Sequence, residues 1–148
     1  MAAAIRTLCA QDVAVAQEVV RSFHSAALSD DYLQSILLNS ANLLLVAQVA
    51  DRVVGFLYGH WIDRLYSASA QLFIYEVEVA EGNRRSGIAS ALMSAALAHA
   101  QRRDARTFVF TNHSNRAAVA LYEKAGGIAR NGDDLLFIFA PTRHGAGA

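Results

Sequence analysis

The sequence is poor in cysteine, in proline and in uncompensated charge, and these shortages exclude several classes of protein. Its 148 residues include one cysteine, Cys9, so no disulfide can form within the chain, and a single thiol suits a reducing cytosol. Lysine and arginine number 13 against 13 aspartate and glutamate, which leaves no net charge to hold a polyanion. We therefore expect neither a disulfide-stapled secreted domain nor a general nucleic-acid-binding protein.

Long apolar runs are also absent. A membrane-spanning helix needs about 20 consecutive apolar residues, whereas the longest candidate, residues 43–50, is short and interrupted by Gln48. The first residues lack the charged segment and apolar stretch of a secretory signal. The chain is 54% hydrophobic and 18% charged, a balance that excludes disorder. We therefore predict one cytoplasmic domain over residues 1–148, with a loose tail from 142 to 148 and no membrane partner.

The spacing of apolar residues predicts strands that alternate with helices. Strands are expected at residues 5–8, 43–49, 53–62, 72–79, 107–110 and 135–140. Helices are expected at residues 12–23, 30–39, 85–103 and 115–124. The first half contains an antiparallel meander, and the unit from 72 to 110 is a right-handed parallel crossover. The order predicts an α/β fold with a mixed sheet and helices on both faces.

The most informative turn joins the strand at 72–79 to the following helix. Residues 81–89 read E-G-N-R-R-S-G-I-A. Helix N-termini attract phosphate groups, and the small residues Gly87 and Ala89 would let a pyrophosphate approach the backbone. Arg84 or Arg85 would add charge-assisted hydrogen bonds. The alternative is an ordinary basic turn capped by glycine, and the stretch is neither a P-loop nor a dinucleotide fingerprint.

A second informative stretch is the helix at 115–124. Asn115 and Tyr122 are seven residues apart, which places them two turns apart on one helix face, and both can point into one cleft. Singly, Asn115 is also typical of a helix N-cap, and Tyr122 of a core aromatic with its hydroxyl at the edge.

Together the two stretches resemble the GNAT superfamily of N-acetyltransferases. The superfamily motif Q/R-x-x-G-x-G/A is matched by Arg84, Gly87 and Ala89. The later signature N-x-x-A-x-x-L-Y is matched by Asn115, Ala118, Leu121 and Tyr122. The resemblance covers residues 5–140. It implies a central mixed sheet of six to seven strands flanked by about four helices, and acetyl-CoA as the cosubstrate.

Within that superfamily, the chain is most similar to the type I aminoglycoside 3-N-acetyltransferases. Their strand I-Y-D-L-A-V and helix A-V-A-L-Y-x-K resemble residues 74–79 and 118–124. Glu76 replaces the aspartate of that strand, and Arg116 replaces an acidic residue. The resemblance implies acetyl transfer to the 3-amino group of an aminoglycoside. The alternatives are acetylation of a protein N-terminus, lysine or polyamine, and a non-catalytic acyl-CoA-binding module.

The resemblance also implies roles for individual residues. Glu76 would take a proton from the substrate ammonium, directly or through water, although a solvent-facing strand residue is the alternative. Tyr122 would protonate the departing thiolate, and Asn115 would hydrogen-bond the pantetheine arm. The backbone of Val77–Val79 would hold the thioester oxygen if a β-bulge splays this strand. The remaining candidates around acetyl-CoA are Arg84, Arg85, Ser86, Gly87, Ile88 and Ala89, and those around the acceptor are Tyr75, Glu76, Glu78 and Asp134.

Two further expectations concern metals and assembly. The five histidines do not cluster and no H-E-x-x-H occurs, so we expect no metal site. The resemblance makes a homodimer a candidate assembly, with the strand at Phe137–Phe139 at its interface, although apolar strands more often lie in the core.

Overall fold

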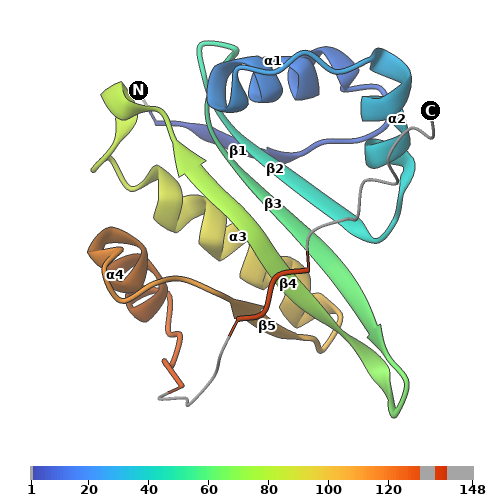
Figure 1. Ribbon diagram of the computed structural model, residues 1–148. Coiled ribbons are helices and arrows are strands. Elements are labelled where there is room, and N and C mark those ends of the chain that lie inside the picture. Colours follow the sequence, from blue (N-terminus) through green and yellow to red (C-terminus); the bar gives the residue numbers. More distant parts are fainter. Residues whose placement is uncertain (1, 131–135, 140–148) are drawn as a thin grey trace, which may run out of the picture.

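A five-stranded sheet forms the centre of the computed structural model, which describes residues 2–130 and 136–139 (Figure 1). The strands are β1 (Ala4–Thr7), β2 (Asn42–Val49), β3 (Arg52–Arg64), β4 (Ser67–Val79) and β5 (Arg106–Val109). They lie in chain order across the sheet. The first four run antiparallel to their neighbours, while β5 pairs with β4 in parallel. The expected meander and parallel crossover are both confirmed.

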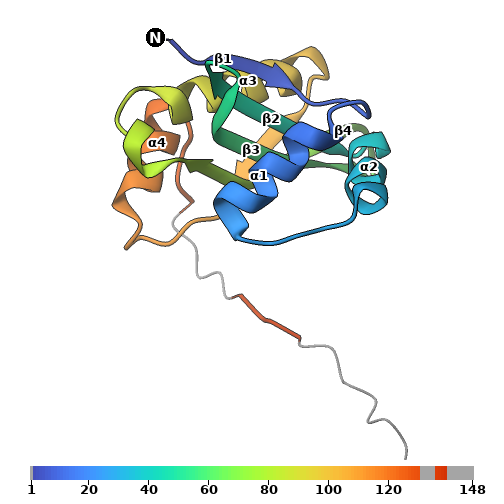
Figure 2. The same ribbon diagram turned by 90° about the horizontal axis from the view of Figure 1, so that it is seen from above.

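The four α-helices are divided between the two faces of the sheet. They are α1 (Val13–His24), α2 (Asp30–Leu38), α3 (Ile88–Arg102) and α4 (Arg116–Lys124), and a short 3-10 helix, η1, spans Glu81–Asn83. Figure 2 shows α1 and α3 on opposite sides of the strands. The mixed α+β architecture with helices on both faces therefore agrees with the prediction.

Each face has its own apolar core, because side chains alternate between the two faces along every strand. The core beneath α3 contains Leu45, Leu57, Leu72, Ile74 and Leu92, all nearly inaccessible to solvent. The core beneath α1 and α2 contains Ala16, Val19, Leu33, Val46 and Phe56. Residues next to each other on β3, such as Phe56 and Leu57, thus belong to different cores, which fixes the register of the sheet.

Gly55 on β3 lets the first turn of α3 approach the sheet closely. A Cβ at this position would lie 3.0 Å from the Glu78 carbonyl oxygen, 3.1 Å from Ile88 Cγ2 and 3.4 Å from Leu92 Cδ1. The close approach places the start of α3 beside the end of β4.

Two sequence predictions are wrong in the described part of the chain. The predicted helix at 85–103 begins at Ile88, because Arg85 (φ 60°) and Gly87 (φ 80°) have left-handed backbone conformations that a right-handed helix excludes. The sheet has five strands there rather than six to seven. Of the strand expected at 135–140, residues 135 and 140 lie outside the described residues, and Leu136–Phe139 is not a strand.

The physical reason for the missing strand is that a strand needs a paired neighbour. Side chains of Leu136–Phe139 are between 72% and 90% exposed, so this segment is neither strand nor core. High β-propensity is expressed only where a neighbouring strand and a packed face are present. The homodimer through Phe137–Phe139 remains a prediction, and the tail at 142–148 lies outside the described residues.

We expect Gly55→Ala to lower the free energy of unfolding by about 1–3 kcal/mol, the usual cost of overpacking, because the Glu78 carbonyl is backbone and cannot move aside. Urea denaturation followed by circular dichroism would measure the change. A variant as stable as the unchanged chain would show that α3 can shift away from β3.

Candidate functional site

A β-bulge in β4 defines the candidate site. Tyr58 of β3 pairs with Glu76, but the next residue, Gly59, pairs with Ile74, so Tyr75 is an extra residue without a partner on β3. In a regular strand, residues 74 and 76 would share one face. The extra residue reverses the alternation, so Ile74 lies in the core beneath α3 whereas Glu76 faces α1 and α2.

The bulge also marks where β4 and β5 stop pairing. Parallel pairing joins Gln71–Ile74 to Arg106–Val109 and ends there. Beyond Ile74, the β5-facing backbone of β4 therefore has no ladder partner on β5. An open strand edge of this kind presents backbone groups that can bind a ligand, and the role of Val77–Val79 stays a prediction.

Glu76 pairs with a histidine that the sequence analysis did not single out. His24, the last residue of α1, places Nε2 3.0 Å from Glu76 Oε2. The imidazole contacts the ring of Phe56 edge-on, with ring centroids 5.9 Å apart. The carboxylate is therefore held from the α1 side of the sheet.

A small apolar cavity of about 220 Å³ opens beside this pair, between the two N-terminal helices and the sheet. Its floor is aliphatic, whereas its polar groups lie on His24, Glu76 and three tyrosines. Burial raises the pKa of Tyr58, with smaller contributions from Tyr32, Glu76 and Tyr75. The lining residues are Ala16, Val19, Val20, His24, Tyr32, Leu33, Ile36, Leu37, Leu44, Phe56, Tyr58, Tyr75 and Glu76.

The turn that precedes α3 has the features of an anion cradle. Arg85 and Gly87 both adopt left-handed conformations; this costs glycine little, but it strains Arg85, and strain of this kind concentrates at functional turns. The Ser86 hydroxyl donates a hydrogen bond to the Asn83 carbonyl, which closes the turn. Arg84 Nε donates to the carbonyl of Val79 at 3.2 Å, which ties the turn back to the end of β4.

Space is open in front of this helix start. The first bond within α3 runs from the Ala91 N–H to the Gly87 carbonyl, so the N–H groups at the helix start have no partner within the helix. A Cβ built on Gly87 would meet no atom within 4 Å. These observations fit a phosphate group at the N-terminus of α3.

Helix α4 carries the other two candidates on the opposite side of the sheet from Glu76. Asn115 is the N-cap of α4, and its Oδ1 accepts the N–H of Ala118 at 3.1 Å. Its oxygen therefore has a structural role, and its amide nitrogen makes no hydrogen bond among the described residues. Tyr122 is half-buried against the core beneath α3, and this burial raises the pKa of its phenol.

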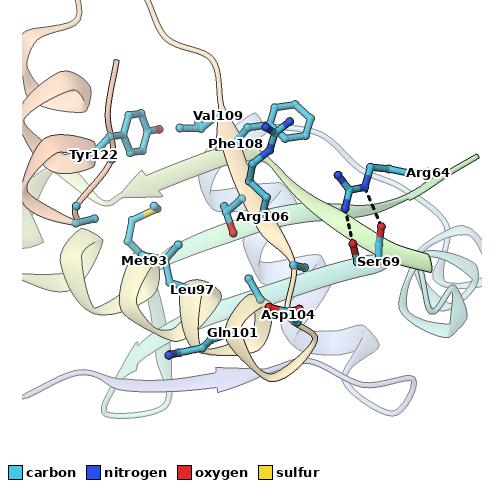
Figure 3. Close-up of a pocket in the computed structure, with 16 residues that line it drawn as sticks. Arg64, Ser69, Met93, Leu97, Gln101, Asp104, Arg106, Phe108, Val109 and Tyr122 are labelled. Atoms are coloured by element: carbon cyan, nitrogen blue, oxygen red, sulfur yellow. Dashed lines mark hydrogen bonds between the residues drawn. The ribbon is translucent and has the colours of Figure 1, made fainter. Parts of the chain in front are cut away.

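A cavity of about 800 Å³ lies between α3, α4 and β5 (Figure 3). Of the predicted site residues, only Tyr122 lines it, with its hydroxyl directed toward Val109 of β5. Its other walls include Met93, Leu97, Gln101, Asp104, Arg106 and Phe108. A groove of about 600 Å³ near the end of β4 contains Glu78, Val79 and Arg84, together with Arg52 from the β2–β3 hairpin.

The structure thus places the predicted residues in three locations: one on each face of the sheet, and one at the end of β4. Tyr75 and Glu76 lie at the bulge with His24, on the side of α1 and α2. Asn115 and Tyr122 lie with α4 on the α3 side, while residues 77–79 and 84–89 form the open strand edge and the turn. Asp134 lies outside the described residues. His24 and Tyr58 were missed because no local motif marks them.

The family follows from a sequence comparison. A model described as the acetyltransferase (GNAT) family matches residues 12–127, which include the bulge, the turn and α4. The chain belongs to the GNAT acetyltransferase family. Membership implies an acyl-CoA cosubstrate in general, and the open turn before α3 suits its phosphates. No curated protein matches the chain.

Several solved structures share the fold of this GNAT chain. An aminoglycoside acetyltransferase, meta-AAC0020, from an uncultured soil metagenomic sample in complex with trehalose has a TM-score of 0.86 at 19% identity, over 95% of this chain and 97% of that one. A second aminoglycoside acetyltransferase, HMB0005, also from an uncultured soil sample, has a TM-score of 0.81 at 23% identity, over 97% and 100%. A ribosomal-protein-alanine N-acetyltransferase from Brucella melitensis biovar Abortus 2308 has a TM-score of 0.75 at 21% identity, over 94% and 100%.

Two kinds of feature are absent from the described residues. No helix there is long and apolar enough to cross a lipid bilayer. Residues 2–130 and 136–139 also contain no group of three or more histidine, cysteine, aspartate or glutamate side chains placed to bind a metal ion.

We expect Gly87→Ala to weaken CoA binding about tenfold, because a Cβ at φ 80° is strained and would enter the open space before α3. Isothermal titration calorimetry with CoA would measure the affinity. Gly82→Ala is the matched control, since Gly82 lies in the same turn without a positive φ and its Cβ would meet nothing. Equal affinities for both variants would contradict the cradle.

Proposed function

We propose that this GNAT protein transfers the acetyl group of acetyl-CoA to the 3-amino group of an aminoglycoside, by direct attack of the amine on the thioester. The observation that carries the proposal is the bulge at Tyr75. It turns the Glu76 carboxylate onto the α1 face of β4 at the point where β4 and β5 separate. An amine on that face can reach a thioester held along the open edge of β4.

The residues proposed to bind acetyl-CoA form a continuous line from the turn to the bulge. N–H groups at the start of α3, from Ser86 to Ala89, would bind the pyrophosphate, with Arg84 and Arg85 nearby. The open backbone of Val77–Val79 would pair with the pantetheine arm, and the Asn115 amide would donate to it. When bound, acetyl-CoA supplies the thioester whose carbonyl carbon the amine attacks.

The two ionisable side chains would manage protons from opposite faces of the sheet. Glu76 takes a proton from the substrate ammonium, directly or through water, so that the nitrogen lone pair can form the N–C bond. The C–S bond then breaks, the Tyr122 hydroxyl donates its proton to the departing sulfur, and the second proton of the nitrogen returns through water to the Tyr122 oxygen, which leaves a neutral amide and a neutral phenol. Because burial raises the pKa of Tyr122, this phenol keeps its proton throughout the physiological range.

Aromatic side chains beside Glu76 support an acceptor built from sugar rings. Phe73 stacks on Phe108 with ring centroids 5.0 Å apart, and Tyr75 and Phe110 extend this surface. Tyr75 is 63% exposed and Phe110 is 77% exposed, so a ligand can reach the faces of both rings. The exposed carboxylate of Glu78, two residues from Glu76, would attract a further ammonium group. We retain Asp134 as a predicted acceptor contact.

The structural neighbours add support for this acceptor class. Structures of meta-AAC0020 include complexes with trehalose and with the aminoglycoside sisomicin. Both have TM-scores of 0.86 to this chain, at 19% and 18% identity. They make an aminoglycoside the first acceptor to test.

The apolar cavity supports a second candidate, acetylation of a protein N-terminus. An amine placed at Glu76 would have its substituent next to the aliphatic walls formed by Val20, Leu33 and Leu44. A small apolar first residue fits such walls better than a polycation does. The similar fold of the ribosomal-protein-alanine N-acetyltransferase agrees with this candidate.

We expect thiol release from acetyl-CoA in the presence of sisomicin, gentamicin or kanamycin, and a fall in kcat of roughly 10²–10⁴-fold in Glu76→Gln, because the variant cannot accept the proton. Glu123→Gln, an exposed change on α4, is the matched control. Turnover of peptides with an N-terminal alanine, but of no aminoglycoside, would replace the first candidate with the second. Binding of acetyl-CoA without turnover of any amine, spermidine included, would indicate a non-catalytic module.

We expect Tyr122→Phe to lower kcat by about 10- to 100-fold while the affinity for CoA stays the same, since only the proton donor is lost. Because burial raises the pKa of Tyr122, this phenol stays protonated to a higher pH than an ordinary phenol does; the unchanged protein should lose rate only as this proton leaves at alkaline pH, and the variant should lack that loss. Steady-state rates across pH would measure both. An unchanged kcat would assign the proton donor elsewhere.

A further inference from the structure

The pair between His24 and Glu76 connects the end of α1 to the bulge of β4. Imidazole Nε2 lies 3.0 Å from Oε2, within hydrogen-bond distance, although the residues are 52 apart in sequence. The side chains are 41% and 29% exposed, so solvent and substrate can reach both. Exposed ion pairs generally contribute little to stability. A role in stability therefore does not account for the pair.

The surroundings hold the imidazole in place. Its ring packs edge-on against Phe56, and the ring of Phe56 also packs against Phe23 with centroids 5.0 Å apart. Helix α1 ends at this residue because Ser25 adopts a left-handed conformation (φ 49°). The backbone of His24 is thus fixed by the helix end and its ring by the Phe56 contact, so it presents Nε2 to the carboxylate.

We propose that His24 is a positioning residue that orients Glu76 for proton transfer from the acceptor amine. The inference rests on the proposed function, in which Glu76 is the base. A hydrogen bond from Nε2 to Oε2 leaves Oε1 for the ammonium group or a water molecule. Without this bond, the Glu76 side chain can rotate away from the gap between β4 and β5.

Two substitutions at residue 24 distinguish the hydrogen bond to Glu76 from the packing of the side chain against Phe56. His24→Leu keeps an apolar contact with Phe56 but removes the donor, and we expect kcat with the best acceptor amine to fall about 10- to 100-fold. His24→Gln supplies an amide N–H that does not titrate, and we expect kcat within about threefold of the unchanged protein. Arg21→Leu, an exposed change in the same helix turn, is the control. KM for acetyl-CoA should be the same in all four proteins.

Rescue of kcat by glutamine but not by leucine is the result that a merely structural role would not give. Equal rates for His24→Leu and the unchanged protein, or equal losses in the Leu and Gln variants, would each overturn the role of His24. Turnover by the unchanged protein would still uphold the proposed function in those cases, whereas no turnover of any amine would overturn both.

Discussion

One extra residue in β4 is the constraint on which the candidate site depends. With Tyr75 inserted between the pairs Tyr58–Glu76 and Gly59–Ile74, the alternation of side chains reverses along the strand. Apolar residues fill the α3 side both before and after the bulge, while Glu76 and Glu78 face the other side. A regular strand would place Glu76 in the core next to Ile74, where an unpaired carboxylate is costly.

Because of the same bulge, the candidate residues Glu76 and Tyr122 lie on opposite faces of the sheet. Pairing between β4 and β5 ends at Ile74, so the strand edge beyond it is open. The turn at residues 84–89 lies at the end of β4, and the close approach at Gly55 holds α3 next to it. Tyr122 lies on the α3 side and Glu76 on the α1 side. In the proposed function, a thioester between them would meet the acid and the base from opposite faces of the sheet.

Charge in this neutral chain acts locally. Arg84 and Arg85 lie in the turn before α3, where the helix dipole also favours anions. The carboxylates of Glu76 and Glu78 lie on the α1 side of β4, and Glu78 shares a groove with Arg52 and Arg84. Charged groups thus gather at the end of β4, even though the chain has no net charge.

By itself, the sequence determined the features that depend on neighbouring residues. The motif at residues 84–89 and the signature at 115–122 predicted the family, and local apolar spacing located the five strands and four helices of the described residues with ends within five residues of those observed. The structure decided what depends on pairing between distant segments. It shows a bulge at Tyr75, because bulges are set by the register against β3, and it brings His24 to Glu76 across 52 residues. Local propensity favoured a strand at 135–140, but Leu136–Phe139 has no strand beside it, and a strand forms only when another strand completes its hydrogen bonds.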